Sequence, residues 1–158
     1  MATEIERKFL VSGDGWQSTD PIYICQGYLN RDKHRTVRVR IAGDKAFLTV
    51  KGPTSQASRK EFEYSIPVAD ARQLLELCEE PLVEKNRHVV EHAGMLWEVD
   101  EFLGENDGLV VAEVELQSEE HPFDLPPWIG LEVTNDARYF NSNLSAHPFT
   151  RWPKDSDT

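Results

Sequence analysis

Polar and apolar residues alternate along most of this chain with a period of two, which is the pattern of β-strands that have one buried face. The alternation predicts strands over residues 3–10, 23–29, 34–41, 45–51, 58–66, 82–92, 95–102, 109–117 and 131–134. Gly43-Asp44 separates two of these strands and is typical of a tight hairpin turn. Short turns between successive strands indicate antiparallel pairing.

The period changes to a helical one at two places. Residues 68–78 carry apolar side chains on one helical face, and Pro67 and Pro81 bracket this segment as a helix start and stop. A second helix is expected over residues 136–145. The predicted fold class is therefore α+β, mainly antiparallel β with a few covering helices. We expect a single domain over residues 1–150 and a tail over residues 151–158.

Composition excludes several classes of protein. The chain has 158 residues and a net charge of −11, which argues against a general binder of nucleic acid or of an anionic membrane. It has no apolar run long enough to cross a membrane, and its charged N-terminus does not resemble a signal peptide. Cys25 and Cys78 are isolated and are expected to be buried thiols rather than a disulfide or a metal pair, so we expect a reducing, cytoplasmic location.

Charged residues occupy one face of most predicted strands. Glu4, Glu6 and Lys8 sit at positions i, i+2 and i+4, which places all three on the same face of the first strand. The same spacing recurs in later strands, and the face opposite the charges is apolar in most of them. The recurring residues are Arg38 and Arg40, Lys51, Arg59, Glu61 and Glu63, Lys85 and Arg87, Glu98 and Asp100, and Glu113 and Glu115.

Two interpretations of these charged faces are open. For any single strand, a solvated outer face is the more common arrangement. Taken together, however, like charges are segregated strand by strand, which is unfavourable unless something in solution compensates them. If the sheet closes into a barrel, the charges line its lumen. Carboxylates there suit Mg²⁺ or Mn²⁺, and Arg and Lys suit phosphate oxygens, so such a lumen is suited to a polyphosphate with its metal ions.

The first strand resembles the Glu-x-Glu-x-Lys signature of the CYTH superfamily, also called triphosphate tunnel metalloenzymes. The charged pairs that follow occur in the order typical of that family. Glu132-Val133-Thr134, Tyr139 and Asn141 resemble the closing segment of its short bacterial members, among them inorganic triphosphatases. The resemblance implies a closed, eight-stranded antiparallel β-barrel that forms a tunnel.

The resemblance also implies roles for individual residues. Divalent metal ions, Mg²⁺ or Mn²⁺, would be held by Glu4, Glu6, Asp100, Glu113 and Glu115. The triphosphate would be bound by Lys8, Arg38, Arg40, Lys51 and Arg87, assisted by Lys85. Glu61 and Glu63 would line the tunnel, and Glu63 or Glu115 would accept a proton from the attacking water. Lys154 in the tail is a candidate gating residue.

The expected activity is metal-dependent hydrolysis of a small-molecule triphosphate, most simply inorganic tripolyphosphate. An adenylyl cyclase or a thiamine triphosphatase on the same fold are alternatives, because they use the same triphosphate clamp. A non-catalytic binder of polyphosphate is an alternative of another class. No nucleic-acid or membrane partner is expected, and an apolar exterior leaves room for a homodimer.

Overall fold

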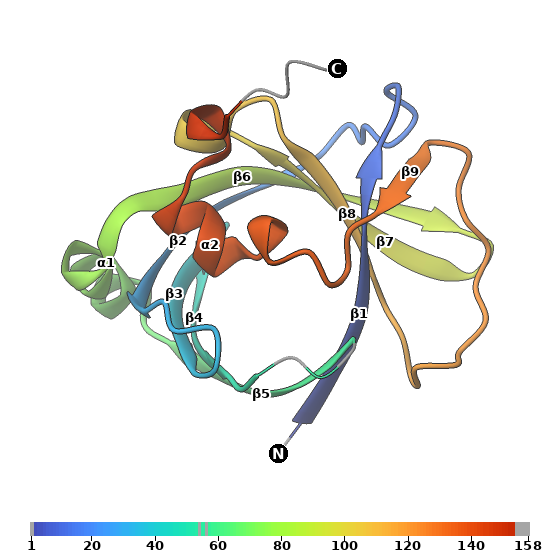
Figure 1. Cartoon of the computed structure of the whole chain (residues 1–158). Helices are drawn as coiled ribbons and strands as arrows, with labels where there is room; N and C mark the ends of the chain where they lie inside the picture. Colours follow the sequence, from blue (N-terminus) through green and yellow to red (C-terminus); the bar gives the residue numbers. More distant parts are fainter. Residues whose placement is uncertain (1, 54, 56, 154–158) are drawn as a thin grey trace.

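The described strands form one antiparallel sheet that closes on itself (Figure 1). The structure is a computed structural model and describes residues 2–53, 55 and 57–153. Its strands are β1 (Ala2–Val11), β2 (Ile22–Asn30), β3 (Thr36–Ala42), β4 (Lys45–Lys51), β5 (Ser58–Ile66), β6 (Glu79–His92), β7 (Met95–Phe102), β8 (Val110–Glu115) and β9 (Ile129–Glu132). Their order is β5-β4-β3-β2-β6-β7-β8-β1-β9, and pairing of β5 with β1 closes a ring of eight. The predicted eight-stranded barrel is confirmed, with β9 as an additional strand.

Strand β1 closes the barrel because it pairs with three other strands. One edge pairs with β8 along residues 6–10, where Lys8 lies opposite Glu113. The other edge pairs first with β5, where Glu4 lies opposite Arg59, and further along with β9, where Phe9 lies opposite Glu132. Two strands therefore share one edge of β1, and the first of them completes the ring.

The alternation of side chains places the apolar face of the sheet on the outside of the barrel. Helix α1 (Val68–Leu77) covers part of this face and packs against an outer cluster that includes Val39 and Ala46. A second outer cluster, around Trp97 and Val114, is covered by the segments that carry Trp16 and Trp128. Apolar burial on the outside leaves the charged faces of most strands to line the lumen.

At one end of the barrel the inner face becomes apolar. Val83, Phe102 and Val111 each lie two residues from a charged residue on the same face of their strand, and they pack with Leu144. Leu144 belongs to α2 (Asn141–Ala146), which lies over one opening of the ring of strands (Figure 1). Arg31 fastens α2 to the wall, because its Nε donates to Ser145 Oγ at 3.1 Å. The lumen is thus covered at this end by a short helix.

The helix predicted over residues 136–145 is interrupted in the structure. A 3₁₀ turn spans Ala137–Tyr139, and its first residue is preceded by Asp136, whose side chain accepts from the backbone N–H of Arg138. Phe140 is then extended, with φ −69° and ψ 136°, before α2 begins. Two further 3₁₀ turns span Gly104–Asn106 and Phe149–Arg151.

The described part of the predicted tail packs against the barrel end. Trp152 stacks edge-on against Tyr139, with ring centroids 5.2 Å apart, and its Nε1 donates to the carbonyl oxygen of His147 at 2.8 Å. Lys154, the candidate gating residue, lies outside the described residues. Among the residues described, no helix combines the length and apolar character needed to cross a membrane.

Candidate active site

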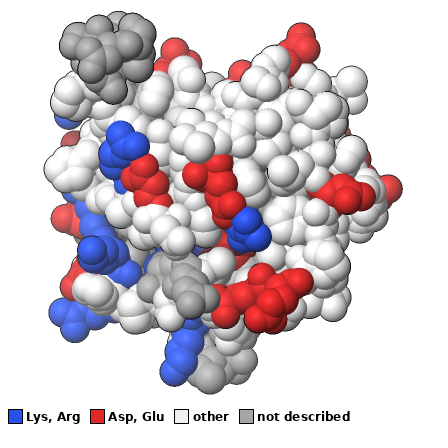
Figure 2. All heavy atoms as spheres, turned by 45° about the vertical axis from the view of Figure 1, so that its right-hand side comes forward, with Lys and Arg blue, Asp and Glu red and all other residues white. Residues whose placement is uncertain are grey.

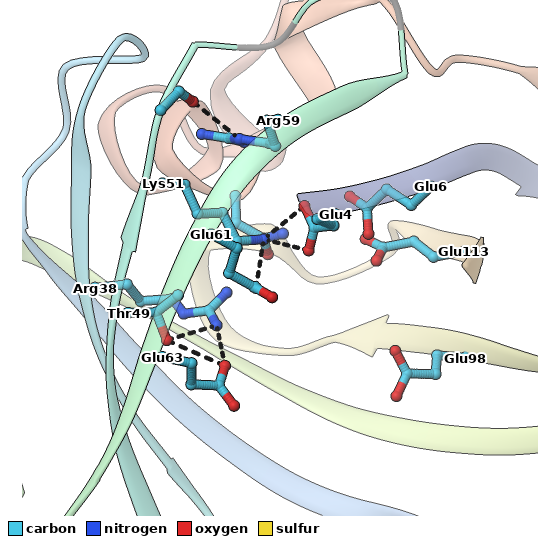
Figure 3. A network of polar contacts seen from close by, with 12 residues as sticks. Glu4, Glu6, Arg38, Thr49, Lys51, Arg59, Glu61, Glu63, Glu98 and Glu113 are labelled. Carbon is cyan, nitrogen blue, oxygen red and sulfur yellow. Dashed lines mark hydrogen bonds and ion pairs between the residues drawn. The ribbon is translucent and has the colours of Figure 1, made fainter. Parts of the chain in front are cut away.

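A cavity of about 690 Å³ occupies the lumen and is lined mainly by charged side chains. Twelve predicted site residues line it, and Figure 3 shows several of them pointing into the shared space. They are Glu4, Glu6, Lys8, Arg38, Arg40, Lys51, Glu61, Glu63, Lys85, Arg87, Glu113 and Glu115. The remaining predicted residue, Asp100, does not line the cavity and is described below.

One wall of the cavity is basic. Arg38 and Arg40 project inward from β3, and Lys85 and Arg87 project inward from β6, with β2 between these two strands. Burial, together with the positive charges of Arg38 and Arg87, lowers the pKa of Arg40 to about 10. The wall therefore concentrates positive charge that is only partly neutralised by the protein.

Glu63 links the two arginines of β3 to the next strands. Its Oε2 lies 3.9 Å from Nη2 of Arg38 and 3.7 Å from Nη2 of Arg40. The Thr49 hydroxyl donates to Glu63 at 3.2 Å and accepts from Arg38 Nη2 at 3.3 Å, and Figure 3 shows this contact chain. Glu63 thus holds both guanidinium groups and is not a free carboxylate in this structure.

Asp100 is buried in the wall behind the cavity, where it pairs with the two basic residues of β6, Lys85 and Arg87. Its carboxylate accepts from Nε and Nη2 of Arg87 at 2.8 and 2.9 Å and pairs with Nζ of Lys85 at 2.8 Å. Although burial opposes its ionisation, Arg87 and Lys85 hold the pKa of Asp100 well below its usual range. The prediction that Asp100 binds metal therefore lacks support in this geometry, because both carboxylate oxygens already face cationic side chains.

The opposite wall is acidic and is built from β1, β8 and β7. Glu6 lies directly opposite Glu115, and Glu98 lies directly opposite Glu113. Burial and nearby carboxylates raise the pKa of Glu113 and of Glu115, with Glu6 and Glu4 as the strongest neighbours respectively. Directly opposed like charges destabilise a sheet, so these pairs favour the binding of a cation.

Lys8 lies within the acidic wall. Its Nζ is 3.8 Å from Glu6 and 3.9 Å from Glu113, and it lies 5.2 Å from the centre of the Phe140 ring. Burial alone would lower the pKa of Lys8, but Glu113, Glu6 and Glu4 together raise it. Lys8 therefore remains charged where the acidic wall meets the closed end of the cavity.

Glu4 forms a separate cluster with Lys51 and Glu61. Lys51 Nζ donates to both carboxylate oxygens of Glu4, at 3.0 and 2.8 Å, and lies 3.6 Å from Glu61 (Figure 3). Glu4, like Asp100, thus pairs closely with a lysine, at 2.8 Å, whereas Glu6 and Glu113 lie 3.8 and 3.9 Å from Lys8.

The cavity also contains residues for which the sequence pattern predicted no individual role. Phe140 and Asn141 close one end of the cavity, and Lys85 Nζ donates to Asn141 Oδ1 at 3.1 Å. Thr49 lines the wall between Arg38 and Glu63. Arg59 also lines the cavity and is held by the carbonyl oxygen of Gly52 at 3.1 Å. Charge alternation indicates Arg59, but no local signal identifies the role of Thr49 or Phe140.

The acidic wall has the donor chemistry that a hard divalent cation requires. Carboxylate oxygens are the protein ligands that Mg²⁺ and Mn²⁺ prefer, and among the described residues the opposed pair of Glu6 and Glu115 makes one ion pair, between Glu6 and Lys8 at 3.8 Å. Within the described residues, no group of three His, Cys, Asp or Glu side chains is ready to hold a metal on its own. Mg²⁺ is commonly bound by one or two carboxylates together with substrate phosphates, so the residues fit a metal that is shared with a phosphate ligand.

Known proteins resemble this chain over most of its length. A model of the CYTH domain matches residues 2–146. An inorganic triphosphatase of Acetivibrio thermocellus is 53% identical over 151 residues, which are 94% of this chain and 97% of that protein. An inorganic triphosphatase of Nitrosomonas europaea is 38% identical over 147 residues, covering 90% and 97%. A crystal structure of an inorganic triphosphatase has a TM-score of 0.66 at 37% identity and covers 92% of this chain and 95% of that one.

Proposed function

This chain belongs to the CYTH family, and from that premise we propose that it hydrolyses inorganic tripolyphosphate with the help of a divalent metal ion. The observation that carries the proposal is the pairing of a basic wall with an acidic wall across one cavity. The two relatives named as inorganic triphosphatases support the choice of substrate. A free triphosphate carries several negative charges, so it needs both cationic side chains and cations for tight binding.

The basic wall binds the phosphate oxygens. Arg38 and Arg40 approach from one side and Lys85 and Arg87 from the other, so a triphosphate between them is contacted along its length. Asp100 fixes the orientation of Lys85 and Arg87 before substrate arrives, which lowers the cost of ordering them on binding.

The acidic wall holds the metal, and Glu6 and Glu113 are the residues that would bind it, with Glu115 opposite Glu6 beside the ion. A divalent ion supplies neutralisation of charge on the transferred phosphoryl group and a place to orient water. Lys8, between Glu6 and Glu113, is positioned to contact a phosphate oxygen on this side. Glu4 contributes indirectly, because it holds Lys51 at the edge of the cavity.

Glu115 is the better candidate to accept the proton of the attacking water. Glu63 is engaged by Arg38, Arg40 and Thr49, whereas no ion pair or hydrogen bond of the Glu115 side chain occurs among the described residues. Burial and the neighbouring carboxylates Glu4 and Glu61 raise the pKa of Glu115, which makes it a stronger base. We therefore assign Glu115 this role and assign Glu63 to positioning the arginines.

Phosphate release from tripolyphosphate with Mg²⁺ or Mn²⁺ tests the proposal. Glu6→Gln removes a proposed metal ligand, and Glu119→Gln is a matched control at an exposed position. We expect release by the wild type and by the control, and strong loss in Glu6→Gln. Binding of tripolyphosphate without release under any divalent ion would instead identify a non-catalytic polyphosphate binder. Cyclic nucleotide formed from ATP would identify a cyclase.

The identity of the metal, the cellular location and the assembly state are further parts of the proposal. Mg²⁺ or Mn²⁺ is supported by the oxygen-only donors of the acidic wall. A reducing cytoplasm is supported by the free thiols of Cys25 and Cys78. On the face shown in Figure 2, the described basic side chains gather along the left and do not form a continuous surface, which supports the absence of a nucleic-acid partner. Size-exclusion chromatography tests the expected homodimer.

A further inference from the structure

Buried polar atoms without a hydrogen-bond partner cluster behind the basic wall. Among the described residues, five buried side-chain atoms lack a partner: Nε2 and Oε1 of Gln26, Nε of Arg38, Nε of Arg40 and Nε1 of Trp97. Four of the five belong to two neighbouring strands, β2 and β3. A buried polar atom without a partner is costly, and in native proteins such an atom calls for a specific explanation, for example a catalytic role or a bound ion.

The register of the sheet brings these atoms face to face. Gln26 lies directly opposite Arg40 in the pairing of β2 with β3, so their side chains share the inner face. Directly opposed residues have Cβ atoms about 5 Å apart, which is within reach of a hydrogen bond between an amide and a guanidinium group. Gln26 is fully buried, so bulk water does not satisfy its amide.

The arginines use only one side of their guanidinium groups in this structure. Nη2 of Arg40 and Nη2 of Arg38 both contact Glu63, which lies on β5, on the far side of β4. Their Nε atoms make no hydrogen bond. Glu63 therefore draws both guanidinium groups away from β2, where Gln26 lies.

We propose that Gln26 is a positioning residue for Arg40. When a phosphate engages the Nη atoms of Arg40 and replaces Glu63, the guanidinium group turns and its Nε–H donates to Oε1 of Gln26. This hydrogen bond gives a partner to two of the five unpaired atoms, Nε of Arg40 and Oε1 of Gln26, and it fixes the guanidinium group against the bound anion. This inference rests on the proposed function only in that the anion is a triphosphate.

The choice of an amide at this position follows from the charges around it. β2 lies between Arg38 and Arg40 on one side and Lys85 and Arg87 on the other. A carboxylate here would orient Arg40 but would also cancel positive charge that the triphosphate needs, as Asp100 already does for Lys85 and Arg87. An amide oxygen accepts the hydrogen bond and leaves the net charge of the wall unchanged.

A double-mutant cycle tests the inference through binding of tripolyphosphate, measured by calorimetry in the absence of metal. Gln26→Met keeps the length of the side chain and removes both orphaned atoms. We expect it to weaken binding roughly tenfold in the wild-type background, the range of a hydrogen bond to a charged group. In the Arg40→Ala background we expect a change of less than about twofold, because the bond that Gln26 would make is already gone.

Thermal unfolding separates this role from a structural one. Gln26→Met is expected to be at least as stable as the wild type without ligand, because two unpaired buried atoms are removed. Trp97→Phe serves as the control. It removes the fifth atom without a partner, Nε1 of Trp97 on the outer face of the barrel, and we expect its binding of tripolyphosphate to be unchanged. Equal weakening in both backgrounds, no weakening by Gln26→Met, or no binding by the wild type overturns the inference. Binding without phosphate release contradicts the proposed function and leaves this inference intact.

Discussion

Replacement of Asp100 by Asn perturbs the most completely buried charge cluster of the cavity wall. Asp100 and Lys85 are each 1% exposed, and the carboxylate neutralises both Lys85 and Arg87 at 2.8 Å. The amide keeps the volume of the side chain but leaves buried Lys85 without its ion-pair partner, and Arg87 with only the half-exposed Glu98, 3.5 Å from its Nη1. Removing one partner of a buried ion pair costs about 3–5 kcal/mol, so we expect Asp100→Asn to lose roughly 3 kcal/mol of unfolding free energy.

Urea unfolding at pH 7 measures this loss, and Asp136→Asn is the matched control. Asp136 also pairs with an arginine, Arg138, at 2.7 Å, but on the surface, where such a pair contributes less than about 1 kcal/mol. Because the pKa of Asp100 is lowered, its contribution is fully present above the ordinary pKa of Asp, about 4, and is lost only as the pH falls far below it. The gap between wild type and variant should therefore close in strong acid.

The same variant separates a positioning role from metal binding. If Asp100 positions Lys85 and Arg87, Asp100→Asn raises KM for tripolyphosphate while the Mg²⁺ concentration for half-maximal activity is unchanged. A stability loss no larger than that of Asp136→Asn refutes the account of a buried counter-charge. If Asp100→Asn instead changes the Mg²⁺ concentration for half-maximal activity and leaves KM unchanged, the result supports the prediction from the sequence that Asp100 is a metal ligand.

Three further predictions follow from single residues. Burial lowers the pKa of Lys85 to about 8, so metal-free binding of tripolyphosphate, followed by calorimetry, should weaken as the pH rises through 8 and Lys85 loses its charge; a flat profile from pH 7 to 9 contradicts this. Glu6→Gln should raise the Mg²⁺ concentration for half-maximal activity by roughly tenfold or more, and an unchanged requirement argues against its role as a ligand. Gly27→Ala should destabilise the fold by about 1–3 kcal/mol in urea unfolding, because the added Cβ would lie 2.6 Å from Leu82 Cδ2 and 2.8 Å from Cys78 Cβ; wild-type stability would show that this packing adjusts freely.

Much of the cavity wall could be predicted because each strand carries its own two-residue period. Glu113 and Glu115, for example, alternate with Ala112 and Val114, and the structure places the first pair in the lumen and the second in the outer core. Recurrence of this pattern with both signs of charge favoured a closed barrel over a solvated sheet. The resemblance of the first strand to a known signature then connected the charged lumen with triphosphate chemistry.

The uninterrupted helix predicted over residues 136–145 was wrong because the environment of one side chain outweighed the local pattern. Phe140 breaks the helical period by adopting an extended conformation, and its ring lies beside the ammonium group of Lys8. A helical period in the sequence indicates which face of a helix is apolar. It carries no information about a tertiary contact, such as that of Phe140 with Lys8, that favours an extended conformation at one residue.

Read by itself, the sequence determined which side of each strand is charged, and hence that the lumen combines carboxylates with Arg and Lys. Only the tertiary structure decided which of those charges remain available. Asp100 has the same spacing from Glu98 as Glu113 has from Glu115, yet Lys85 and Arg87 occupy its oxygens, whereas Glu6 and Glu115 oppose each other across a strand pair. The physical reason is that alternation specifies the face on which a side chain lies, whereas barrel closure and strand register specify the partner that it meets there.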